Sequence, residues 1–172
     1  MFLSIREMEQ RKLAFDESYS PGEVEFLDSQ LRQITPLKVT GTAELVSESL
    51  GEVRVRGRLS VLMEAECDRC LEPAHYQIET DFDLYYEPVA QLGPAQEVEI
   101  GARETDVGFY EGGGLELEEV LRERVLLALP MQRVCRIDCK GICPVCGQNR
   151  NEGECGCRSK LVDERWAALK QF

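Results

Sequence analysis

The sequence predicts an α+β fold: mainly an antiparallel β-sheet or partly closed barrel, with one packed helix and a C-terminal zinc-knuckle module. Apolar and polar residues alternate along much of residues 37–88, one later stretch has helical periodicity, and eight cysteines lie in close pairs. We expect residues 1–130 to form the sheet domain, including a helix over residues 115–129. Residues 131–172 should form the cysteine-rich zinc module, with a terminal helix packed on it.

The strands are predicted from alternation with a period of two residues. In the run over residues 52–66, apolar side chains share one face and mostly charged side chains occupy the other, as expected of a half-buried sheet. The apolar positions are Val53, Val55, Leu59, Val61, Met63 and Ala65. A run over residues 76–86 alternates similarly, and an earlier run over residues 37–50 ends at a turn signal, Ser49–Gly51. We therefore expect a twisted antiparallel meander.

The packed helix is predicted by the stretch LELEEVLRERVLLALP, which follows three consecutive glycines. Its glutamates suit the positive N-terminal end of a helix, and Pro130 ends it. Its apolar stripe comprises Leu117, Val120, Leu121, Val125 and Ala128. Residues 89–114 show no sustained periodicity, and we interpret them as a connection. The terminal helix should begin at Asp163, with Trp166 and Leu169 as apolar anchors.

The excess of acidic residues indicates which class of macromolecule the protein binds. With 32 acidic against 20 basic residues, the formal charge is -12, which opposes nonspecific attraction to nucleic acid and favours a basic protein partner. No stretch has the length and apolar character of a signal peptide or a membrane span. We therefore expect a cytoplasmic protein. In that reducing compartment, closely spaced cysteines indicate metal binding rather than disulfides.

The cysteines form four pairs at metal-ligand spacing: Cys67/Cys70, Cys135/Cys139, Cys143/Cys146 and Cys155/Cys157. We expect the last two pairs to share one zinc ion, because the turn-rich loop between them can close over a single ion. The first two pairs would then share a second zinc ion. A rival arrangement, in which the first and third pairs share one ion, stays open at this point.

Other roles for the cysteines are weaker. A redox role for the first pair is disfavoured because predicted strands flank it, and buried or free thiols have no reason to cluster at ligand spacing. Four thiolates close the coordination shell, so both ions should be structural rather than catalytic. The single histidine, His75, has no evident nucleophile beside it, and no phosphate-binding loop is present. We expect no enzyme activity and no small-molecule substrate.

Four segments occur in this order along residues 20–172: ECDRCLEP, VLLALP, CKGICPVCGQNRNEGECGC and DERWAALKQF. Their combination resembles the YceD family of large ribosomal RNA subunit accumulation proteins. The resemblance implies a bacterial cytosolic factor needed for accumulation or processing of 23S ribosomal RNA, and it implies no catalysis. On this basis we expect the partner to be a basic ribosomal protein or a large-subunit precursor particle.

Two groups of basic residues leave direct contact with ribosomal RNA as the alternative function. Arg54, Arg56 and Arg58 occupy successive outward positions of one predicted strand. The second group surrounds the cysteines and comprises Arg133, Arg136, Lys140, Arg150, Arg158 and Lys160. A solvated strand face, and cations that offset thiolate charge, explain the two groups more simply. A thiol redox enzyme is a third hypothesis.

Overall fold

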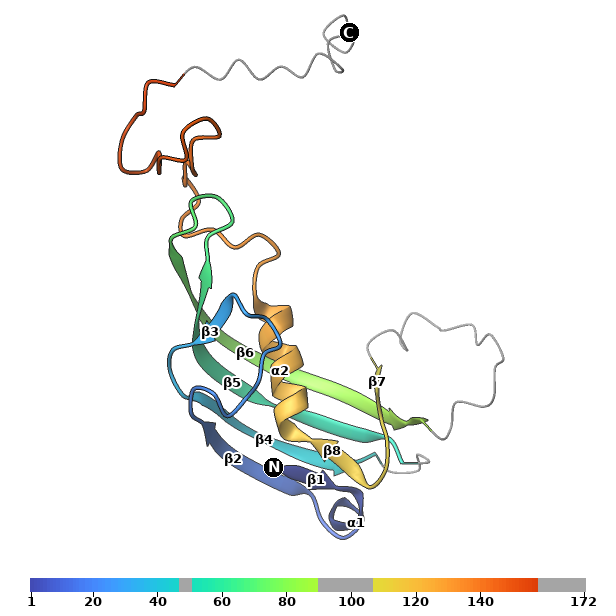
Figure 1. The fold of residues 1–172 in the computed structure, drawn as a ribbon. Helices are drawn as coiled ribbons and strands as arrows, with labels where there is room; N and C mark the ends of the chain where they lie inside the picture. Colours follow the sequence, from blue (N-terminus) through green and yellow to red (C-terminus); the bar gives the residue numbers. More distant parts are fainter. Residues whose placement is uncertain (47–50, 90–106, 158–172) are drawn as a thin grey trace, which may run out of the picture. The chain divides into compact units, whose positions relative to one another are not determined.

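The computed structural model describes residues 1–46, 51–89 and 107–157 (Figure 1). Its elements in chain order are β1 (Phe2–Ser4), α1 (Ile5–Met8), β2 (Leu13–Tyr19), β3 (Leu31–Gln33), β4 (Leu37–Leu45), β5 (Val53–Glu66), β6 (Pro73–Pro88), β7 (Val107–Tyr110), β8 (Gly114–Glu116) and α2 (Leu117–Ala128). Ser49, most of the expected connection and the expected terminal helix lie outside the described residues. Neither of the helices in the described ranges has the length and apolar character of a membrane span.

The chain divides into two compact units. Unit 1 comprises residues 1–65 and 75–131, and unit 2 comprises residues 66–74 together with the chain from residue 132 onward. The turn between β5 and β6 therefore belongs to unit 2, although both strands belong mainly to unit 1. The division into domains of residues 1–130 and 131–172 stays a prediction.

The main sheet of unit 1 is open. Its strand order is β2-β4-β5-β6-β7. The short strand β3 also pairs with β5, at residues 63–65, beyond the residues 53–60 that pair with β4. The pairs β2/β4, β4/β5 and β3/β5 are antiparallel, whereas β6 and β7 are parallel. The predicted α+β fold with a mainly antiparallel sheet is confirmed. The described strands do not close into a barrel, because β2 and β7 stay at opposite ends of the strand order.

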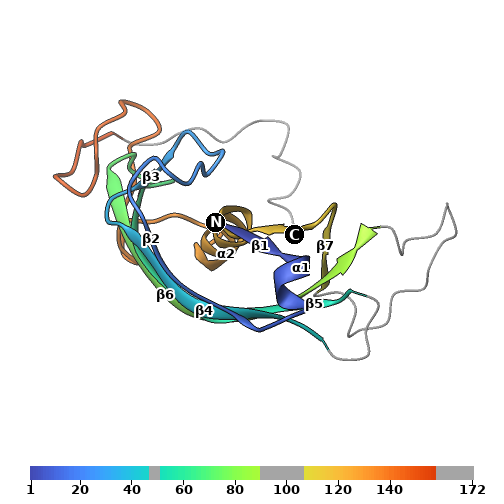
Figure 2. The ribbon, with the colours of Figure 1, turned by 90° about the horizontal axis from the view of Figure 1, so that it is seen from below.

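The core of unit 1 lies between the sheet and α2, and Figure 2 shows the sheet curving around this helix. The six predicted apolar positions of β5 are all buried. Four of the five positions in the predicted helix stripe are also buried, and only Ala128 is exposed. The helix begins later than predicted, at Leu117, because residues 114–116 form β8 and pair with β1.

Two strand glycines pair with each other where aromatic rings lie against the sheet: Gly41 of β4 and Gly57 of β5. A Cβ atom on Gly41 would lie 2.4 Å from the carbonyl oxygen of Arg56 and 2.6 Å from the ring of Phe15. A Cβ atom on Gly57 would lie 2.4 Å from the carbonyl oxygen of Thr40 and 3.0 Å from the ring of Phe82. The nearest atom at each glycine belongs to the backbone, which cannot move aside as a side chain can. Both positions therefore require glycine.

We predict that Gly57→Ala lowers the free energy of unfolding by about 1–3 kcal/mol, the usual cost of overpacking. The measurement is urea denaturation followed by circular dichroism. Gly113→Ala is the matched control, because a Cβ atom there would meet nothing within 4 Å. Equal stability of the two variants would contradict this account of the sheet.

Candidate metal centres

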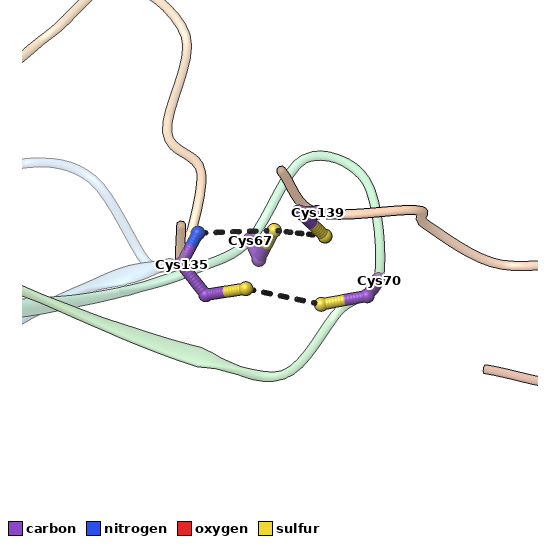
Figure 3. A group of neighbouring side chains, drawn as sticks. All are labelled: Cys67, Cys70, Cys135 and Cys139. Carbon is purple, nitrogen blue, oxygen red and sulfur yellow. Dashed lines mark hydrogen bonds between the residues drawn. The ribbon is translucent and has the colours of Figure 1, made fainter. Parts of the chain in front are cut away.

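The first group of cysteines, tetrad 1, consists of Cys67, Cys70, Cys135 and Cys139, whose sulfur atoms all lie within 4.8 Å of one another (Figure 3). The Sγ atoms of Cys67 and Cys139 are 3.8 Å apart, and those of Cys70 and Cys135 are 3.6 Å apart. All four are free thiols, and only Cys135 is exposed. All four cysteines belong to unit 2.

The turn after β5 brings the first two sulfurs of tetrad 1 together. The Leu71 N–H donates to the Cys67 carbonyl at 2.9 Å, and the Cys67 N–H donates to the Glu72 carbonyl at 2.9 Å. Leu71 has a φ of 64°, an uncommon conformation for a leucine, and the chain reverses here into β6. The Cys135 N–H then donates to the Cys67 sulfur at 3.3 Å, which favours a thiolate there.

Two reciprocal hydrogen bonds join the segment after α2 to this turn. The Asp68 N–H donates to the Arg133 carbonyl at 2.7 Å, and the Arg133 N–H donates to the Asp68 carboxylate at 2.6 Å. The Arg69 guanidinium also donates to the Cys139 carbonyl, at 3.2 Å. These bonds position both halves of tetrad 1 through backbone and side-chain groups that are not themselves ligands.

Tetrad 2 consists of Cys143, Cys146, Cys155 and Cys157, which also lie within 4.8 Å of one another. Its first pair sits in a tight turn, where the Gly147 N–H donates to the Cys143 carbonyl at 2.8 Å. The Cys143 N–H donates in turn to the Gln148 carbonyl at 2.8 Å. Gly147 and Gly156 both have positive φ, of 75° and 67°, which glycine adopts at low cost.

The thiol groups within each tetrad differ in acidity. Burial acts to raise the pKa of Cys67, but the backbone N–H groups of Cys135 and Arg69 outweigh it, and the pKa falls to about 6. Backbone N–H groups of Cys146 and Val145 lower the pKa of Cys143 to about 6. The neighbouring sulfurs of Cys146 and Cys155 raise the pKa of Cys157 to about 12. A bound divalent cation would lower the pKa of all four cysteines, because its charge stabilises every thiolate.

The donor set and its spacing fit zinc. Four sulfurs around one zinc ion, each at about 2.3 Å, lie about 3.8 Å from one another, whereas disulfide sulfurs lie at about 2.0 Å. The Sγ–Sγ separations of 3.8 and 3.6 Å in tetrad 1 match the geometry of four sulfurs around zinc. The structure groups the cysteines as in our preferred arrangement and does not bring the first and third pairs together in one tetrad. Metal ligation by these eight residues stays a prediction.

The basic stripe on β5, formed by Arg54, Arg56 and Arg58, is paired with acidic side chains. Its ion pairs are Arg54–Asp83, Arg58–Asp81 and Arg56–Glu44. Arg54 donates through Nε to Asp83 at 2.7 Å, and this bond holds the pKa of Asp83 below its usual range. His75 lies with Nε2 3.1 Å from the Glu64 carboxylate. The three arginines are therefore already paired with acidic side chains.

Two contacts of the site have no signal in the sequence: the Asp68–Arg133 pair and the bond from Asn151 to Cys139. Asp68 and Arg133 are separated by a long stretch of chain, so their mutual contact has no local pattern. Asn151 lies in a polar loop, yet its Nδ2 donates to the Cys139 sulfur at 3.3 Å. An asparagine in a turn-rich loop predicts only a turn.

Comparison with known proteins gives one family. A family model described as large ribosomal RNA subunit accumulation protein YceD matches residues 55–172. No solved structure matches the chain.

Three curated relatives illustrate the similarity. An uncharacterized protein of Mycobacterium tuberculosis (strain H37Rv) is 31% identical over 158 residues, covering 91% of this chain and 72% of the relative. The uncharacterized protein YlbN of Bacillus subtilis is 26% identical, covering 98% and 92%. The large ribosomal RNA subunit accumulation protein YceD of Haemophilus influenzae is 28% identical, covering 71% and 67%.

We predict that the purified protein contains two zinc ions and that Cys67→Ser and Cys143→Ser each contain one. Each substitution removes one thiolate from a different tetrad, which opens that site and leaves the other closed. The measurement is metal content by elemental analysis. Val145→Ser is the control, because this exposed residue lies between two ligands of tetrad 2 without offering a thiolate. Loss of both ions in either variant would contradict two separate sites.

Proposed function

Because this chain belongs to the YceD family of large ribosomal RNA subunit accumulation proteins, we propose that it is a non-enzymatic factor in ribosome biogenesis. It promotes the accumulation or processing of 23S ribosomal RNA by binding a basic ribosomal protein or a large-subunit precursor particle. The family match carries this proposal, and the matched residues 55–172 include both tetrads.

The charge of the molecule supports a protein partner. The chain has a formal charge of -12, and zinc bound by four thiolates would add further negative charge at each tetrad. The arginines of β5, the most regular basic feature of the sequence, pair with Asp83, Asp81 and Glu44. A basic protein is attracted to such a surface, whereas a phosphate backbone is repelled by it.

The role proposed for the tetrads is structural. Four thiolates leave no coordination position for water or substrate, so a zinc ion there would stabilise its loops rather than act as a Lewis acid. These loops present large apolar side chains to solvent: Leu71, Ile137 and Val145 are 59%, 95% and 54% exposed. Exposed apolar side chains on metal-stabilised loops support contact with a macromolecular partner.

The proposal predicts that deletion of the gene lowers the ratio of 23S to 16S ribosomal RNA and that a plasmid copy restores it. Affinity purification of the tagged full-length protein should recover a ribosomal protein or a large-subunit precursor. The controls are an untagged strain and an unrelated acidic protein with the same tag. An unchanged ratio, together with recovery of no ribosomal component, would show that the proposal is wrong.

Salt dependence distinguishes this function from direct RNA binding. If the purified protein binds ribosomal RNA through phosphate contacts, the logarithm of its affinity falls linearly and steeply with the logarithm of salt concentration. We expect no such binding at physiological salt with the protein alone. Tight binding to naked 23S RNA with a steep salt dependence would favour the zinc-dependent RNA-binding module instead.

A further inference from the structure

Asn151 belongs to the loop of tetrad 2, but its side chain contacts a sulfur of tetrad 1. Its Nδ2 donates to the Sγ atom of Cys139 at 3.3 Å, and its Oδ1 accepts a hydrogen bond from the Lys140 N–H at 2.8 Å. A backbone N–H can only donate, so the second bond fixes which end of the amide faces the sulfur. The Asn151 side chain therefore donates to a candidate ligand of tetrad 1.

The loop that carries Asn151 runs between two cysteines of tetrad 2, Cys146 and Cys155. Inside the loop, the Asn151 N–H donates to Oδ1 of Asn149 at 3.0 Å. The Arg150 N–H donates to the Gly141 carbonyl at 2.9 Å, which holds the loop against the chain that links the tetrads. An ion in tetrad 2 would fix both ends of this loop and so restrict the positions open to Asn151.

We infer that Asn151 couples the two metal sites, so that an ion bound in tetrad 2 strengthens metal binding in tetrad 1. The inference rests on the proposed binding of metal by both tetrads. A donor to a ligand atom orients that ligand and stabilises its charge, and loss of such a contact typically costs about 10–100-fold in metal affinity. Because binding free energies are linked, an ion in tetrad 1 strengthens binding in tetrad 2 by the same factor.

The experiment uses cadmium as the probe, because it binds four thiolates and each site gives its own NMR resonance. The proteins are the full-length wild type, Cys155→Ser, Asn151→Ala and the double variant, titrated in competition with a chelator. Cys155→Ser removes a ligand of tetrad 2 and should lower the cadmium affinity of tetrad 1 by about tenfold or more. Asn151→Ala should cause a similar loss at tetrad 1 while both resonances remain.

The double variant tests whether the coupling runs through Asn151. If it does, Cys155→Ser and Asn151→Ala remove the same interaction, so tetrad 1 in the double variant should be no weaker than in either single variant. Additive losses would overturn the inference, as would an unchanged affinity of tetrad 1 in Asn151→Ala.

Two further variants separate the hydrogen bond from general damage to the loop. Asn151→Asp keeps an oxygen for the Lys140 N–H but sets a negative charge against the Cys139 sulfur, so it should weaken tetrad 1 at least as much as Asn151→Ala. Gln148→Ala removes an exposed amide side chain from the same loop but keeps the backbone carbonyl that accepts from the Cys143 N–H, so it should behave as wild type. Equal weakening by Gln148→Ala would overturn the inference. Absence of cadmium from both tetrads of the wild type would instead refute metal binding itself.

Discussion

The convergence of four sulfur atoms in tetrad 1 is the constraint around which unit 2 is arranged. Cys67 and Cys135 are 68 positions apart in the chain, yet the backbone N–H of one donates to the sulfur of the other. Four thiolates this close repel one another, and without a cation some must stay protonated. A bound divalent ion would replace that repulsion with four favourable contacts. The Asp68–Arg133 pair and the Asn151 side chain hold cysteines that would be its ligands.

The fold of unit 1 depends on a different constraint, which is that the sheet must curve around one helix (Figure 2). Gly41 and Gly57 leave room for the rings of Phe15 and Phe82, and the apolar face of β5 packs in the core. The opposite positions of β5 carry arginines that pair with acids on neighbouring strands. Each exposed pair contributes little stability, but together they leave no row of unpaired cations on β5. This pairing supports the proposal that a protein partner is recognised through charge and shape complementarity.

Local patterns in the sequence predicted the parts of the molecule that depend on local chemistry. Alternation identified the buried face of β5, and helical spacing identified α2, because burial imposes those periods directly. The pairs of cysteines were predicted by ligand spacing, and their preferred grouping by the turn-rich loop between Cys146 and Cys155. Long-range pairings were not predictable in this way. Residues 114–116 pair with β1, which shortened the predicted helix, and β7 adds to the sheet in parallel after a long connection.

The difference between local patterns and long-range contacts also explains which residues of the site could be predicted. Tetrad ligands carry a motif, whereas Asp68, Arg133 and Asn151 act through contacts that only the folded chain brings together. X-ray absorption at the zinc edge of the purified full-length protein tests directly whether the two tetrads bind zinc. Two closed tetrathiolate sites predict a first shell of four sulfur atoms at about 2.3 Å, with no nitrogen or oxygen ligand. A first shell that includes nitrogen or oxygen, or a protein purified without zinc, would contradict two closed tetrathiolate centres.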